Sequence, residues 1–114
     1  MKSKTSNKSA FARYIVDDLL QNLDDIKAKA MFGGYGLYQG DKMFGLIDDD
    51  VVYFKVDVAS RGDYEAEGSE PFTYEVKGRK KPVVMSYWRV PESVLDSPEL
   101  ATEWAMKAIR VKKK

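Results

Sequence analysis

Several residue types that enzymes use most for catalysis are missing from this chain. Its 114 residues include no histidine and no cysteine. Histidine is the usual base that activates a serine or cysteine nucleophile, and cysteine thiolates are typical ligands of structural zinc. The sequence therefore excludes disulfides, zinc-thiolate centres and histidine-activated nucleophiles. We expect a protein that is not an enzyme and that binds no cofactor and no metal, although acid–base chemistry on carboxylates, lysines and tyrosines stays open.

A glycine-rich segment could bind phosphate through its backbone. It comprises Phe32, Gly33, Gly34 and Gly36. A phosphate-binding loop needs its glycines to lead from a strand into the N-terminus of a helix. Here the following residues have the pattern of a strand, which instead favours a β-bulge or a close approach of two backbones. We interpret these four residues as structural.

Three consecutive acids, Asp48, Asp49 and Asp50, could attract a hard cation. A calcium loop, however, distributes its oxygen ligands over about twelve residues. Three adjacent carboxylates between two strand-like segments are more typical of a solvated hairpin turn, and that is the interpretation we favour.

A basic segment is the strongest candidate for a binding site. It comprises Lys77, Arg79, Lys80 and Lys81. With Tyr87 and Trp88 following, it could bind nucleic acid through phosphate contacts and base stacking. Charged hairpin tips also protect sheet proteins from aggregation. The sequence leaves both explanations open, and it equally allows these four residues to contact a protein partner.

The small net charge of +1 conceals a strong segregation of charge. Twelve of the nineteen basic residues lie in residues 1–8, 77–81 and 107–114, which contain no acid. We expect a disordered basic tail over 1–8, one domain over 9–110 and a basic tail over 111–114. No run of 18 apolar residues and no signal-peptide pattern occurs, so we expect a cytoplasmic protein.

Hydrophobic periodicity predicts the elements that position these segments. An apolar stripe with a spacing of about four residues predicts a helix from Ser9 to about Leu23. Strand patterns cover 29–39, 42–47, 51–56, 72–77 and 83–90, with a helix over 58–67 and another starting at the Ser97 cap. We predict an α+β, two-layer fold of α-β-β-β-α-β-β-α order. Its five-stranded, mainly antiparallel sheet has the helices packed on one face.

Several of these segments, in their order, resemble one known family. They are 31–38 (MFGGYGLY), 43–46 (MFGL), 52–57 (VYFKVD), Arg61 with Tyr64 and Gly68, 71–72 (PF), 85–91 (MSYWRVP) and 103–105 (EWA). Together they resemble the N-terminal domain of the TfoX (Sxy) competence regulators over about residues 9–110. Phe32, Gly33 and Gly34 match the hallmark of that family.

The resemblance implies a two-layer α/β fold of the same element order and no catalytic residues. It also implies a non-enzymatic protein-interaction domain in bacterial transcription regulation, with a transcription factor such as the cyclic-AMP receptor protein as partner. The regulators continue into a second, helical domain, so we expect a stand-alone relative or a truncated piece, as monomer or homodimer. Two alternatives stay open: a nucleic-acid-binding module that uses the 77–81 loop and the C-terminal lysines, and a small-ligand-binding or enzymatic domain.

Overall fold

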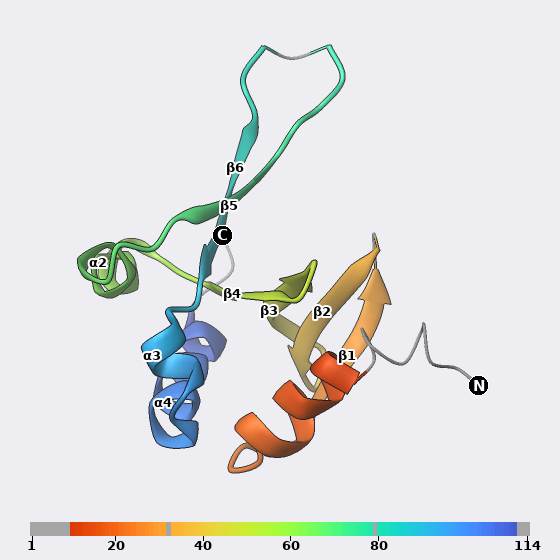
Figure 1. Ribbon diagram of the computed structural model, residues 1–114, viewed down its shortest axis with the longest axis vertical. Coiled ribbons are helices and arrows are strands. Elements are labelled where there is room, and N and C mark those ends of the chain that lie inside the picture. The colour runs from red at the N-terminus through yellow and green to blue at the C-terminus, as the bar shows by residue number, and fades with distance from the viewer. Residues whose placement is uncertain (1–9, 32, 79, 112–114) are drawn as a thin grey trace.

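The computed structural model describes residues 10–31, 33–78 and 80–111, and Figure 1 shows their arrangement. Residues 10–13 are α-helical and continue into a π-helical segment, η1 (Tyr14–Leu19). The other helices are α2 (Val58–Ala66), α3 (Glu92–Leu95) and α4 (Pro98–Arg110). The strands are β1 (Ile26–Met31), β2 (Gly34–Gln39), β3 (Lys42–Asp48), β4 (Val51–Lys55), β5 (Pro71–Tyr74) and β6 (Val83–Arg89).

The predicted α+β fold with an antiparallel sheet is confirmed, but the sheet has six strands rather than five. The strand order is β1-β2-β3-β4-β6-β5, and every neighbouring pair is antiparallel. The difference arises at 29–39, where the expected single strand is two strands joined by a tight turn. Gly33 lies in that turn with φ of 81°, a conformation that glycine adopts without steric cost. The short helix α3 was also not expected.

Two-residue turns explain why the first four strands form a meander. Asp48 pairs with Val51, and the two residues between them, Asp49 and Asp50, have φ of 53° and 63°. Positive φ at both central residues is the requirement of a type I′ turn, whose twist matches that of the strands it joins. Of the three acids that could have attracted a cation, Asp48 therefore ends β3, and Asp49 and Asp50 form the turn between β3 and β4.

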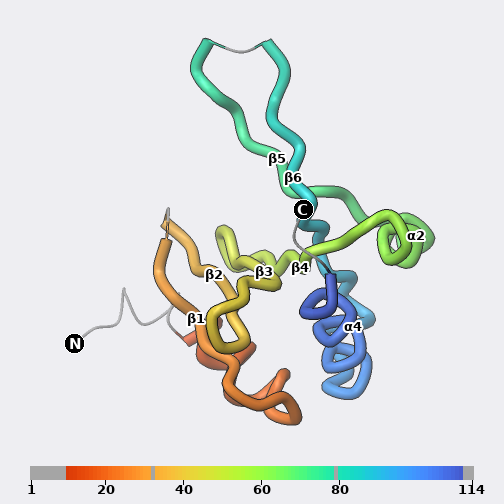
Figure 2. The backbone as a smooth tube through the Cα atoms, turned by 180° about the vertical axis from the view of Figure 1, so that it is seen from behind, coloured from red at the N-terminus to blue at the C-terminus, as the bar shows by residue number. Residues whose placement is uncertain are grey.

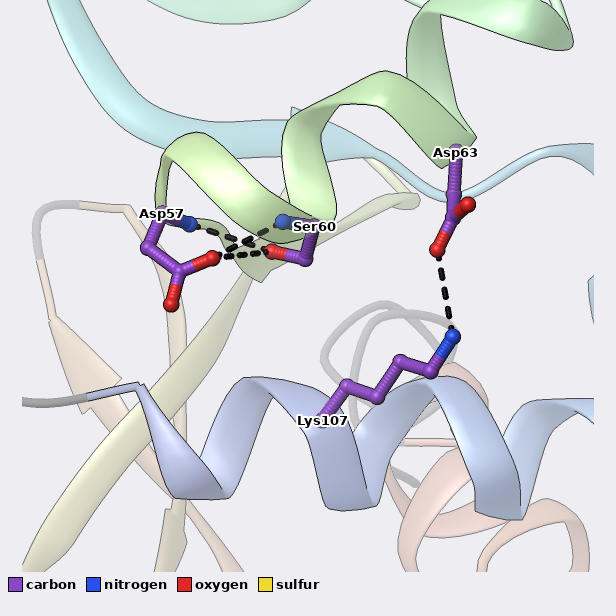
Figure 3. A network of polar contacts seen from close by, with 4 residues as sticks. All are labelled: Asp57, Ser60, Asp63 and Lys107. Carbon is purple, nitrogen blue, oxygen red and sulfur yellow. Dashed lines mark hydrogen bonds and ion pairs between the residues drawn. The ribbon is translucent and has the colours of Figure 1, made fainter.

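The helices begin at the caps that the sequence indicates. The Asp57 carboxylate accepts a hydrogen bond from the Ser60 backbone N–H at 2.8 Å, and the Ser60 hydroxyl accepts one from the Asp57 N–H at 3.1 Å. Figure 3 shows this capping box. Ser97 caps α4. Ser9, the predicted tail at 1–8 and residues 112–114 of the tail predicted over 111–114 lie outside the described residues.

One face of the sheet packs against helices and forms the core. Its largest fully buried side chains on the strands are Leu37, Phe44, Val52 and Phe54, and η1 contributes Ile15, Leu19 and Leu20 to the same cluster. Alanines of α4 allow that helix to approach β3 and β4 closely. Figures 1 and 2 show η1 and α4 on the same side of the strands. We call this the covered face.

Candidate functional site

The other face of the sheet, which we call the open face, does not contribute to the core described above. Because side chains alternate along a strand, the neighbours of the core residues must point to this face. Phe54 lies in the core, for example, so Tyr53 and Lys55 project to the open side. The open face is rich in aromatic and methionine side chains, namely Met31, Tyr38, Met43, Tyr53, Phe72, Tyr74, Met85 and Tyr87, and it also carries Leu46.

A mainly apolar groove of about 650 Å³ runs over the open face. Leu46 and Tyr87, each only 9% exposed, also line it. Met31, Met43 and Met85 converge on it from β1, β3 and β6, which places three of the five methionines of the chain in one groove. Methionine is unbranched and polarizable, so methionine-rich surfaces adapt to apolar partners.

Two glycines make room for this arrangement. A Cβ atom at Gly36 would lie 2.8 Å from the Met31 sulfur and 3.3 Å from Cε of Met43. A Cβ atom at Gly34 would lie 2.1 Å from the backbone oxygen of Ile47, closer than any side chain can approach. The glycine-rich segment thus allows the close approach of β2 to β3 and leaves room for the Met31 and Met43 side chains beside β2. Phe32 lies outside the described residues.

The tyrosines around the groove act as neutral aromatic surfaces. Burial raises the pKa of the Tyr87 phenol. The pKa of the Tyr53 phenol is also raised, mainly by burial and next by the nearby Asp48 carboxylate, whereas Arg89 lowers it. Tyr53 also packs edge-on against Phe72, with ring centroids 5.0 Å apart. Both phenols therefore keep their protons at neutral pH, which makes them poor general bases.

Lysines lie beside two of these rings. The Lys29 Nζ atom is 4.7 Å from the centroid of the Tyr38 ring, and the Lys55 Nζ atom is 5.7 Å from that of Tyr87. Both distances suit cation–π attraction. The apolar groove therefore has positive charge beside it, in addition to the carboxylate of Asp48 in its lining.

The basic residues that the sequence singles out lie apart from the core, at the end of the β5–β6 hairpin. Lys77, Lys80 and Lys81 are exposed there, and Arg79 lies outside the described residues. The two aromatic residues considered with them point to opposite faces of the sheet. Tyr87 lines the groove, whereas Trp88 packs against the core. Tyr87 and Trp88 therefore do not form a shared stacking platform next to the basic loop.

The groove itself was not predicted, although a signal for it exists in the sequence. Strand β6, for example, carries apolar residues on both faces, with Met85 and Tyr87 on one and Val84 and Trp88 on the other. Such a strand pattern predicts a second sheet face that is not wholly solvated. Which strands lie next to one another could not be derived from this pattern, so the residues could not be assembled into one surface.

A second hollow, of about 320 Å³, lies between α2 and α4 and is lined by charged side chains that partly neutralise one another. Figure 3 shows the ion pair across it, in which the Lys107 Nζ atom lies 3.1 Å from an Asp63 carboxylate oxygen. An exposed pair of this kind contributes about 0–1 kcal/mol. We therefore regard this hollow as a junction between helices.

Within residues 10–31, 33–78 and 80–111, no three acidic side chains gather in a way that could hold a metal ion. Asp48, Asp49 and Asp50 are included in this statement. No helix in this part of the chain is long and apolar enough to cross a membrane.

The fold and the groove define an α+β domain with one helix-covered and one open sheet face, without a recognisable catalytic constellation in the described residues. The model of the TfoX N-terminal domain family matches residues 18–112. The chain therefore belongs to this family, as its sequence motifs predicted, and is a competence-regulator-like domain. The family is not a known enzyme family. A search of curated proteins found no match.

Proposed function

We propose that this chain is a non-enzymatic protein-interaction domain that acts in transcription regulation in the bacterial cytoplasm. The observation that carries the proposal is the apolar groove on the open face. Monomeric proteins rarely expose large contiguous apolar surfaces, and those that do commonly use them for binding. Family membership adds the regulatory context.

The composition of the open face supports a polypeptide as its ligand. Aromatic residues and methionine are enriched in protein interfaces, whereas charged side chains are depleted at their centres. The groove has this composition, with Asp48 as the one charged side chain among the residues that line it. The cations beside the tyrosine rings form part of a polar rim of the kind that surrounds such centres.

The regulatory part of the proposal is tested with a purified partner. We propose the cyclic-AMP receptor protein as the transcription factor, because the resemblance to the competence regulators supplies it. The fluorescence anisotropy of the labelled chain is measured as that protein is added, with and without cyclic AMP. Binding is the expected result.

Two matched variants locate the contact. Met43→Lys places a charge in the groove, whereas Val58→Lys places the same charge on α2, where Val58 is already 82% exposed. A charge buried at the centre of an interface weakens binding by about tenfold or more, so Met43→Lys should reduce the affinity and Val58→Lys should not. Equal affinities of the two variants would contradict a contact through the open face.

Nucleic-acid binding is the second candidate function. The observation that favours it is the position of Lys77, Lys80 and Lys81, which are exposed together at the tip of a projecting hairpin. Phosphate contacts release counterions, so the affinity for DNA would fall steeply with salt. Anisotropy titrations of labelled duplex and single-stranded DNA at low and at physiological salt test this. Binding that survives Lys77→Ala, Lys80→Ala and Lys81→Ala together would rule out this site.

A further inference from the structure

The end of the β5–β6 hairpin projects from the body of the protein. Figures 1 and 2 show it extending away from all helices. We call residues 74–78 and 80–84 the arm. Strand β5 packs mainly against β6, its partner in the hairpin. A two-stranded hairpin is only marginally stable in water, so an arm of this kind gains stability when another surface covers it.

The arm exposes apolar side chains on both of its faces. Val84 is 64% exposed, Tyr74 is 44% exposed and Val76 is 36% exposed. Val84 lies on the side of the sheet that faces the helices, but it is not among the side chains of the core. The arm thus presents apolar surface in the same molecule that presents an apolar groove.

The charges at the end of the arm are opposite to those at the β3–β4 turn beside the groove. The arm carries Lys77, Lys80 and Lys81 against one acid, Glu75. Asp48 lines the groove, and Asp49 and Asp50 follow it in the turn between β3 and β4. We call these three residues the acidic turn. In the described part of the chain, the ion pairs are Arg61–Glu65 and Lys107–Asp63, so neither set is paired within the molecule.

We propose that the groove binds the arm of a second copy of this chain, in a twofold symmetric dimer in which each arm lies on the open face of the other copy. This inference rests on the proposed function, because it takes the open face to be a surface that binds polypeptides and names a second copy of the chain as one of them. Apolar arm residues outside the groove lining, such as Val76, cover the methionines of the groove, and the lysines at the end of the arm reach the acidic turn. Both halves of the contact occur in one chain, which is the requirement of a twofold interface.

The dimensions are compatible with this arrangement. At about 3.3 Å per residue, the five residues 74–78 can span at most about 16 Å, which is about three spacings between neighbouring strands. Three spacings separate β5 from β3 in the sheet order, and β3 ends at the acidic turn. An arm that enters the groove on the β5 side can therefore reach the acidic turn at the end of β3. The net charge of +1 causes little repulsion between copies.

The oligomeric state is the first measurement. Sedimentation velocity over a wide range of concentrations is expected to show a species of twice the mass of the 13.0 kDa chain. A chain that remains monomeric at all concentrations would overturn the proposal.

Charge reversal then tests the contact itself. An arm variant carries Lys77→Glu, Lys80→Glu and Lys81→Glu. A turn variant carries Asp48→Lys, Asp49→Asn and Asp50→Asn, because asparagine tolerates the positive φ of the last two positions. Each variant places like charges against each other in its own dimer, so each alone should dimerise about tenfold or more weakly.

An equimolar mixture of the two variants should dimerise again. In the mixed dimer, the acidic arm meets the basic turn, and the unchanged arm of the turn variant meets the unchanged turn of the arm variant. Failure of the mixture to form the heterodimer, with circular dichroism showing that both variants are folded, would overturn the proposed contact. A dimer whose stability changes in neither variant would also overturn the proposed contact.

The outcomes separate this inference from the proposed function. A monomeric chain that binds the transcription factor through the groove, with Met43→Lys reducing that binding, overturns the dimer and supports the proposed function. A dimer that shows the charge reversal but no regulator binding supports the inference and leaves the regulatory role unsupported.

Discussion

The two faces of one sheet differ in what their apolar side chains contact. On the covered face, Leu37 and Phe54 have no exposed surface, because η1 and α4 pack against them. On the open face, apolar side chains of the same sheet, such as Met31, Met43 and Met85, line a groove instead. The same alternation in sequence thus produces a folding core on one side and an open groove on the other. The helices alone make the difference.

Adjacent positions in β4 measure this contrast most directly. Phe54 is fully buried and packs against Phe44 with ring centroids 5.8 Å apart, so Phe54→Ala should lower the free energy of unfolding by about 3–5 kcal/mol. Tyr53→Ala removes an open-face ring that packs against Phe72, and should cost about 1–2 kcal/mol. Urea denaturation of both variants checks the values. Equal losses would show that both faces contribute equally to stability.

The glycines that shape the groove provide a second test. Gly34→Ala forces a methyl group against the Ile47 carbonyl, and overpacking of this kind typically costs about 1–3 kcal/mol. Gly62→Ala is the matched control, because a Cβ atom there meets nothing within 4 Å in helix α2. It should stabilise the protein by about 0.5–1 kcal/mol. Thermal unfolding should therefore shift in opposite directions for the two variants.

The cap of α2 tests how firmly the covered side is held together. This helix buries Tyr64 against Trp104 of α4, with ring centroids 4.6 Å apart. Because N-cap acids contribute typically about 1 kcal/mol, Asp57→Ala should cost about that much at neutral pH, or less since the cap is exposed.

Acid should abolish the effect of the cap. Hydrogen bonds that Ser60 donates to the Asp57 carboxylate, first from its backbone N–H and then from its hydroxyl, lower the pKa of Asp57 below its ordinary value. A lowered pKa in the folded state stabilises the protein above the unfolded value of about 3.9, and this contribution is lost as the pH falls through the folded value. Urea titrations of the wild type and Asp57→Ala should converge at acidic pH. A difference that stays constant with pH would show that the carboxylate charge is not involved.

The smallest expected effect concerns the acidic turn beside the groove. Asp50 has φ of 63°, and glycine adopts this conformation without the cost that a side chain incurs. Asp50→Gly should therefore raise the free energy of unfolding by about 0.5–1 kcal/mol, measured by urea denaturation at low protein concentration. The same change removes one carboxylate that the arm of a second copy would meet, so it should slightly weaken the dimer. A more stable variant with stronger dimerisation would contradict the role of the turn.

Local patterns in the sequence predicted most of the elements, because helices and strands depend on residues that are close in the chain. Ser97 and Asp57 mark the starts of α4 and α2, and the alternation in β4 places Phe54 and Tyr53 on opposite faces. The missed turn within 29–39 has a local cause as well. Gly33 occurs where apolar residues continue on both sides, and so short a turn interrupts the pattern too briefly to be recognised.

The groove could not be predicted in this way, because its residues come from strands that only pairing brings together. β6 pairs with β4 across the helix α2 and the strand β5, and this pairing places Met85 and Tyr87 beside residues from the first half of the chain. The sequence by itself determined the family, the class of fold and the two-sided character of the strands. The tertiary structure alone decided which of the two faces the helices cover, since the hydrophobic effect has no direction and either face could have been buried.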